Sequence, residues 1–145
     1  MKTLHFTTTI NAPKAKVWST MLDDETYREW TSAFAEGSSY EGSWEQGSKI
    51  VFGDPDGNGM VSRIAENRPH EFISIEHVGF VQNGIEDTES EDAKKFAGAR
   101  ENYTFRETDG VTELKVDMDT DEEYRSMFEE MWPRALKKLK SLCEA

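Results

Sequence analysis

The feature that most constrains the fold is a long amphipathic helix predicted over residues 121–143. Thr120 is followed three residues later by Glu123, the spacing of a capping box. Acidic residues open the segment, and Arg134 and three lysines close it, which suits the helix dipole at both ends. Such a helix would be roughly 33 Å long, enough to cross a small domain. Its apolar side needs another layer to pack against.

The apolar stripe of this helix changes character along its length. The first half carries large or flexible side chains, namely Tyr124, Met127, Phe128, Met131 and Trp132. The second half carries compact aliphatic ones, namely Ala135, Leu136, Leu139 and Leu142. Methionines and aromatics can line an irregular space, so we expect a cavity under the first half; a solid core is the alternative. Pro133 lies between the halves and is expected to bend the helix.

The first third of the chain predicts a strand and two short helices. Residues 4–10 alternate apolar and polar side chains, the period of a strand with one buried face. Pro13 fits the first turn of a helix. A second short helix, starting at Asp23 or Asp24, should carry Trp30 inward.

The middle of the chain predicts antiparallel strands. Residues 38–119 contain about five strand-like runs divided by turn residues, and Asp109-Gly110 predicts a tight hairpin. Residues 82–99 are acidic and rich in small side chains; we expect a long mobile loop with a helical turn near Ala93 to Phe96. It could be a lid or only a solvated insertion. The order of elements predicts an α+β fold, with the last helix laid across a curved sheet.

Length and composition limit the classes of function that the chain can have. The length of 145 residues predicts a single domain, 1–145. A formal charge of -12, from 17 Lys and Arg against 29 Asp and Glu, disfavours nucleic acid as a partner. We expect a cytoplasmic protein with no membrane span, because no apolar run is long enough and the first residues lack the apolar core of a secretory signal. Cys143, the single cysteine, can form neither an internal disulfide nor a zinc site.

Several stretches resemble one known group of proteins. TINAPKAKVWSTMLDDETYREWT is similar to the N-terminal signature of the START-like superfamily, also called SRPBCC. WEQGSKIVF, GNGMVSRIAENRPHEFISIEH and FEEMWPRALKKLKSLCEA resemble later parts of its branch named for the activator of the heat-shock protein 90 ATPase. The likeness covers nearly the whole chain, through order and spacing rather than any single motif. The chain departs from the pattern at Ser48, where a second glycine is usual, and in the acidic insertion after Phe80.

The resemblance implies a helix-grip fold of the birch-pollen-allergen type, in which a bent antiparallel sheet wraps around the terminal helix and leaves an apolar cavity. Members include carriers of hydrophobic ligands, hormone receptors, polyketide cyclases and the chaperone activator. The fold alone does not choose among these functions.

Catalytic signals are few. His77 shares a strand face with Ile73 and Ile75, and it can orient a ligand if that face looks inward; a structural histidine is the alternative. Tyr103, His77 or Glu76 would serve a cyclase or hydrolase.

No phosphate-binding, redox or Ser-His-Asp pattern occurs, so no catalytic residue and no cofactor are expected. Asp54 to Gly59 imitate half of a calcium loop, but Ala65 stands where a glutamate is required, which favours an ordinary turn and no metal.

The sequence therefore favours non-enzymatic binding of a small hydrophobic or amphipathic ligand. A module that acts on a chaperone ATPase, and a superfamily enzyme, are the alternatives. The expected ligand-binding residues are Trp30, Phe34, Phe52, Ile75, His77, Tyr103, Phe105, Met118, Met127 and Met131.

Overall fold

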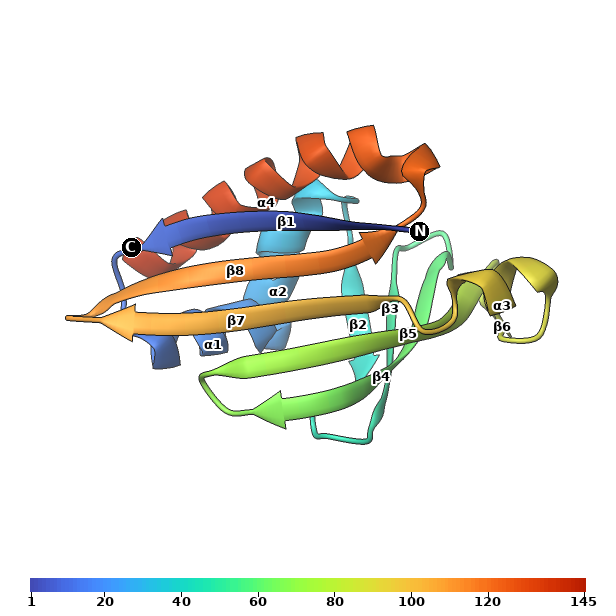
Figure 1. Ribbon diagram of the computed structural model, residues 1–145, viewed down its shortest axis with the longest axis horizontal. Coiled ribbons are helices and arrows are strands. Elements are labelled where there is room, and N and C mark those ends of the chain that lie inside the picture. The colour runs from blue at the N-terminus through green and yellow to red at the C-terminus, as the bar shows by residue number, and fades with distance from the viewer.

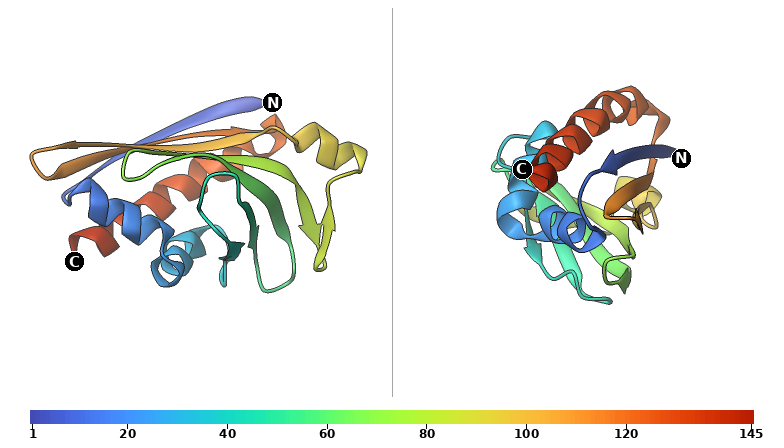
Figure 2. Two further views of the ribbon diagram at one scale, coloured as in Figure 1. Left: turned by 90° about the horizontal axis from the view of Figure 1, so that it is seen from below. Right: turned by 90° about the vertical axis from the view of Figure 1, so that its left-hand side faces the viewer.

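The computed structural model describes residues 1–145 and shows the helix-grip arrangement of an α+β fold (Figure 1). A curved antiparallel sheet forms one layer. Helices α1, α2 and α4 lie together on one side of it, and α3 lies at one end (Figure 2). The strands are β1 Lys2–Ile10, β2 Ser39–Gly42, β3 Lys49–Gly53, β4 Gly59–Arg68, β5 Phe72–Gln82, β6 Ile85–Asp87, β7 Arg100–Thr108 and β8 Val111–Thr120. The helices are α1 Lys14–Leu22, α2 Asp24–Trp30, α3 Glu91–Phe96 and α4 Arg125–Glu144, with short 3-10 helices η1 Thr31–Ala33 and η2 Glu122–Tyr124.

The sheet has the order β1-β8-β7-β5-β4-β3-β2, with β6 added to β5. Every pairing is antiparallel. The predicted hairpin is confirmed: Asp109 and Gly110 join β7 to β8 with φ of 51° and 80°, the positive values a type I′ turn needs. Strand β1 then joins the outer side of β8 along its whole length, from Lys2 opposite Thr120 to Ile10 opposite Thr112.

The two N-terminal helices form where the sequence predicts them. Pro13 is the N-cap of α1 rather than a residue of its first turn, so the helix begins at Lys14. Trp30 is buried, and its indole Nε1 donates to the carbonyl of Met21 at 3.0 Å, which ties α2 to α1. Trp44 Nε1 and the hydroxyl of Tyr40 both donate to the carbonyl of Leu22, at 3.0 and 2.6 Å. These bonds satisfy carbonyls at the end of α1 that no helical partner reaches.

Helix α4 begins later than predicted. Thr120 belongs to β8 and pairs with Lys2, so it does not cap a helix, and the predicted capping box is wrong. A 3-10 turn intervenes, and α4 starts at Arg125 without a side-chain cap. The helix then runs unbroken through Pro133, and the bend expected there stays a prediction.

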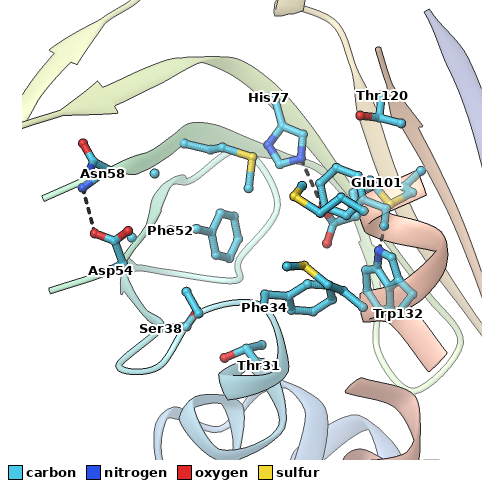
Figure 3. Close-up of a pocket in the computed structure, with 18 of the residues that line it drawn as sticks. Thr31, Phe34, Ser38, Phe52, Asp54, Asn58, His77, Glu101, Thr120 and Trp132 are labelled. Atoms are coloured by element: carbon cyan, nitrogen blue, oxygen red, sulfur yellow. Dashed lines mark hydrogen bonds and ion pairs between the residues drawn. The ribbon is translucent and has the colours of Figure 1, made fainter. Parts of the chain in front are cut away.

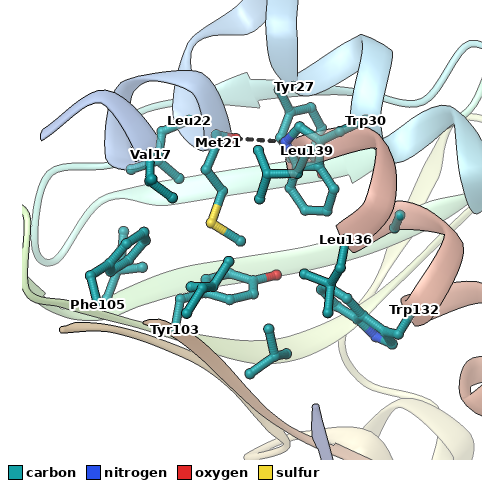
Figure 4. Packing of buried hydrophobic residues seen from close by; sticks show 14 of the residues in the cluster. Val17, Met21, Leu22, Tyr27, Trp30, Tyr103, Phe105, Trp132, Leu136 and Leu139 are labelled. Carbon is teal, nitrogen blue, oxygen red and sulfur yellow. Dashed lines mark hydrogen bonds between the residues drawn. The ribbon is translucent and has the colours of Figure 1, made fainter. Parts of the chain in front are cut away.

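The two halves of α4 differ in burial. The second half packs into the core through Ala135, Leu136, Leu139 and Cys143, all buried (Figure 4). In the first half, Met127 is 40% exposed and only Trp132 is fully buried, and Tyr124, just before the helix, is 45% exposed. Compact side chains therefore hold the helix close to the sheet at one end, while bulkier ones hold it away at the other.

The acidic segment 82–99 is not the long loop that we expected. It forms β6, which pairs with β5, and the helix α3, which confirms the helical turn near Ala93 to Phe96. Ser90 caps α3 by accepting from the backbone N–H of Ala93 at 3.1 Å. The region 38–119 holds seven strands rather than about five, because β2 and β6 have only four and three residues, too few for alternation to reveal.

We expect Leu139→Ala to lower the free energy of unfolding by about 2–5 kcal/mol, because it removes a fully buried side chain and leaves a void. Ser141→Ala, at an exposed position of the same helix, should change it by less than about 0.5 kcal/mol. Urea unfolding followed by tryptophan fluorescence measures both. Equal effects of the two substitutions would contradict the packing described for α4.

Candidate ligand-binding cavity

A partly open cavity of about 270 Å³ lies between the first half of α4 and the concave face of the sheet. Helix α2 and the turn η1 close one side, and strands β3, β4, β5, β7 and β8 form the other (Figure 3). The cavity is where the sequence predicts it, under the methionines and aromatic side chains of the last helix. It exists because the large side chains of that half cannot pack as closely as the leucines further along.

Apolar side chains make up most of the cavity wall. They are Tyr27, Trp30, Phe34, Ala35, Phe52, Met60, Phe96, Tyr103, Met118, Met127, Phe128, Met131 and Trp132. Eight of the ten residues expected at the site line it, namely Trp30, Phe34, Phe52, His77, Tyr103, Met118, Met127 and Met131.

The remaining two residues lie elsewhere. Ile75 is 1% exposed and packs in the solid core opposite Ile64 of β4. Phe105 packs against Trp18 of α1, with ring centroids 5.2 Å apart. Both face the interior as predicted; Phe105 lies in the part of the core near Val17 of α1 (Figure 4), and Ile75 belongs to the same buried cluster. Alternation shows which face is buried and cannot show how far along the strand the cavity extends.

Trp132 anchors the wall of the cavity. Its ring lies 4.9 Å from Phe34, 6.0 Å from Trp30 and 6.1 Å from Tyr103, measured between centroids. The indole Nε1 faces the sulfur of Met118 at 2.8 Å. Such contacts fix the rings in place before any ligand arrives, which lowers the ordering cost of binding.

A row of polar side chains crosses the otherwise apolar wall. On β4 and β5, Ser62 Oγ lies 2.7 Å from His77 Nδ1. His77 Nε2 lies 3.3 Å from Glu101 Oε1 on β7, and the hydroxyl of Tyr103 donates to Glu101 Oε2. The tautomer that satisfies every contact has the proton on Nε2, because Ser62 can then donate to Nδ1 and His77 to Glu101. The inward direction of His77 also confirms that the face shared with Ile75 looks into the core.

Burial raises the pKa of Tyr103 well above its ordinary value, and the negative charge of Glu101 adds to the effect. The pKa of Tyr27 is raised for the same two reasons, burial first. Both phenols therefore stay protonated at neutral pH. Tyr103 can only donate to Glu101, which leaves the carboxylate as the acceptor of the row.

The polar row lacks the exposed nucleophile of a Ser-His-acid triad. Ser62, whose hydroxyl contacts His77, is buried and does not line the cavity. Glu76, a candidate for an enzyme, points away from the cavity and pairs with Arg63. The arrangement can orient a polar group of a ligand and offers His77 and Glu101 as proton acceptors or donors.

Glu101 and Phe96 also line the cavity, although the sequence did not indicate them as site residues. Glu101 stands two positions before Tyr103, so both lie on the same face of β7, and this spacing was the available signal. The sequence did not indicate Phe96 as a cavity residue, because it belongs to α3, in the acidic segment that was expected to be a loop. Its ring stacks on His77 and Phe80, with centroids 5.3 and 4.8 Å apart.

The loop that resembles half of a calcium site is a turn between β3 and β4. Asp54 Oδ1 accepts from the backbone N–H groups of Asp56 and Asn58 at 2.9 and 3.0 Å. The flanks are strands, as the sequence indicates. No group of three or more His, Cys, Asp or Glu side chains is placed to hold a metal ion.

The sheet, the gripping helix and the cavity between them define a START-like, SRPBCC-type protein. Within that class, residues 11–144 match the family described as "Activator of Hsp90 ATPase homolog 1-like protein". The chain belongs to this family, as the resemblance implied. Comparison with curated protein sequences gave no match. None of the helices combines the length and apolar content that crossing a membrane requires.

Solved structures with the same fold share little sequence with the chain. Protein MLL2253 from Mesorhizobium loti is similar at 15% identity and a TM-score of 0.75, over 97% of this chain and 96% of that one. The Aha1 dimer from Colwellia psychrerythraea gives 16% identity and a TM-score of 0.76, over 99% and 97%. CalU16 from Micromonospora echinospora gives 16% and 0.64, over 97% and 73%. These likenesses extend to the fold alone.

The raised pKa of Tyr103 predicts a loss of stability in alkali. The unfolded chain ionises its tyrosines near pH 10, while buried Tyr103 stays protonated, so the contribution is fully present below pH 10 and is lost as the pH rises toward the folded pKa. We expect Tyr103→Phe to make the fall in unfolding free energy above pH 10 shallower by about 1.4 kcal/mol per pH unit. Urea unfolding between pH 8 and 11.5 measures the slope. Tyr124→Phe, at an exposed tyrosine, is the control, and an unchanged slope in Tyr103→Phe would refute the assignment.

Proposed function

We propose that the protein binds a small hydrophobic or amphipathic molecule in the cavity beneath α4. The observation that carries this proposal is the cavity of about 270 Å³ with a mainly apolar wall. An apolar wall left in contact with water is unfavourable, and a ligand that covers it recovers that free energy. A volume of about 270 Å³ suits a compact molecule.

The methionine side chains on the α4 side of the cavity favour reversible binding. Met127 and Met131 lie on the α4 side of the wall, and Met127 is 40% exposed. Methionine side chains change rotamer at little cost, so they can give way to a ligand and close over it. Polar contacts that orient the ligand come from the row of His77, Glu101 and Tyr103.

Action on a chaperone ATPase is suggested by the family description alone. That function would favour a continuous exposed apolar surface for the partner. The exposed large apolar side chains are Met1, Ile85, Tyr124 and Met127, and they come from three separate segments of the chain. The partly open, mainly apolar cavity is the stronger feature, so binding of a small ligand is the function that the geometry favours.

A neutral dye whose fluorescence rises in apolar surroundings, such as N-phenylnaphthylamine, should bind with one site per chain. Met131→Trp adds bulk to the cavity wall and should weaken dye binding at least about tenfold, because the ligand then competes with the new ring for space. Fluorescence titration measures both affinities.

Ile85→Trp is the matched control, because Ile85 is 70% exposed and lies outside the cavity wall. It should leave the affinity unchanged. Native mass spectrometry of freshly purified protein adds an independent check through any apolar compound that copurifies. The proposal fails if the dye does not bind, or if both tryptophan variants bind it as the parent protein does.

A further inference from the structure

The charged groups of the cavity wall all have the same sign. Three carboxylates line it, those of Asp54, Glu101 and Asp119, and no lysine or arginine does. None of the three forms an ion pair with a lysine or arginine elsewhere in the structure. The space is therefore mainly apolar, and its charges are negative apart from any that His77, the partner of Glu101, carries when it is protonated.

The three carboxylates are not equivalent. Asp54 is engaged by the backbone of its own turn. Asp119 accepts from the hydroxyl of Thr3 at 2.7 Å through one oxygen, and from the backbone N–H of Arg100 at 2.9 Å through the other. Glu101 lies inside, between His77 and Trp132, with its side chain 17% exposed (Figure 3). It is the carboxylate that a bound molecule would meet.

Glu101 keeps capacity to accept further hydrogen bonds. A carboxylate has about four acceptor positions, and here one is used by Tyr103 and one by His77. Tyr103, and His77 in its neutral form, donate hydrogen bonds to Glu101 without neutralising its charge. A buried charge in this state gains most from a cation that brings its own hydrogen atoms.

The rings around Glu101 suit the same cation. Phe34, Phe52 and Trp132 present aromatic surface to the space beside the carboxylate (Figure 3). Aromatic faces attract an ammonium group through their electron density, and they also cover the apolar part of the molecule that carries it.

We propose that the ligand of this cavity is a small amphipathic amine, whose protonated nitrogen contacts Glu101 and whose apolar body packs among the aromatic and methionine side chains. This inference rests on the proposed function and narrows it to one chemical class. Anionic ligands such as fatty acids would place a second negative charge beside Glu101 with no cation to offset it. Neutral ligands would fill the space but leave the carboxylate without a counter-charge.

Three compounds with one carbon skeleton test the proposal: naphthylethylamine, naphthylethanol and naphthylacetate. Isothermal titration at pH 7 and 0.15 M salt gives the affinity of each; salt at that strength screens charges beyond about 8 Å and leaves a contact inside the cavity largely intact. We expect the amine to bind about tenfold or more tightly than the alcohol, and the alcohol more tightly than the acid.

Glu101→Gln keeps the size of the side chain and its acceptor for Tyr103 while removing the charge. It should bring the amine down to the affinity of the alcohol and leave the alcohol nearly unchanged. Glu113→Gln is the control, because it changes the net charge by the same amount at an exposed position at the far end of β8 from Thr120. It should preserve the preference for the amine. Thermal unfolding shows whether each variant folds, and the three-compound series on the parent protein stands without any variant.

The outcomes separate the two proposals. Preference for the amine in the parent protein, lost in Glu101→Gln and kept in Glu113→Gln, supports the inference. Equal binding of amine and alcohol, or tighter binding of the acid, overturns the inference while leaving a general hydrophobic binder. Absence of binding by all three, together with absence of dye binding, removes the binding function and the inference with it.

Discussion

The contact between α4 and the concave face of the sheet is the interaction on which the rest of the structure depends. Ala135, Leu136 and Leu139 bring one half of the helix against the strands and against α1 and α2. The same rigid helix must then carry its other half over the sheet, where Met131 and Trp132 cannot approach as closely. Unequal side-chain size along one helix thus accounts for the cavity.

Burying the polar row from Ser62 to Tyr103 costs free energy, and the hydrogen bonds among its members offset that cost. Ser62, His77 and Glu101 are partnered across neighbouring strands, which the ladders of β4, β5 and β7 hold in register, and Tyr103 donates to Glu101 on its own strand. A carboxylate kept in a low-dielectric space by neutral donors remains strongly attractive to positive charge. Packing gives the cavity its shape, and this row gives it polarity.

The sequence was sufficient for the class of fold, the first strand, the two short helices, the β7–β8 hairpin and the position of the cavity. Each of these follows from local chemistry: alternation in β1, the Asp109-Gly110 turn, and the change of side-chain type along α4. Prediction from the sequence failed where the structure depends on pairing between segments far apart in the chain. Thr120 and Glu123 have the spacing of a cap, yet Thr120 pairs with Lys2 at the other end of the chain. Glu101 and Phe96 reach the cavity through the placement of β7 and α3, which no local pattern reports, and Phe105 was misassigned because its strand face runs past the cavity's edge.

The pairing of β1 with β8 also has a consequence for biosynthesis. Thr120, the partner of Lys2, is synthesised 118 residues after it, which takes on the order of ten seconds at ordinary translation rates. Until then β1 has no strand to pair with, and the apolar concave surface of the sheet is not covered by α4. Nascent chains of this protein must therefore pass through a period of exposed apolar surface that ends only when β8 and α4 emerge, and holding factors at the exit tunnel would act within that interval.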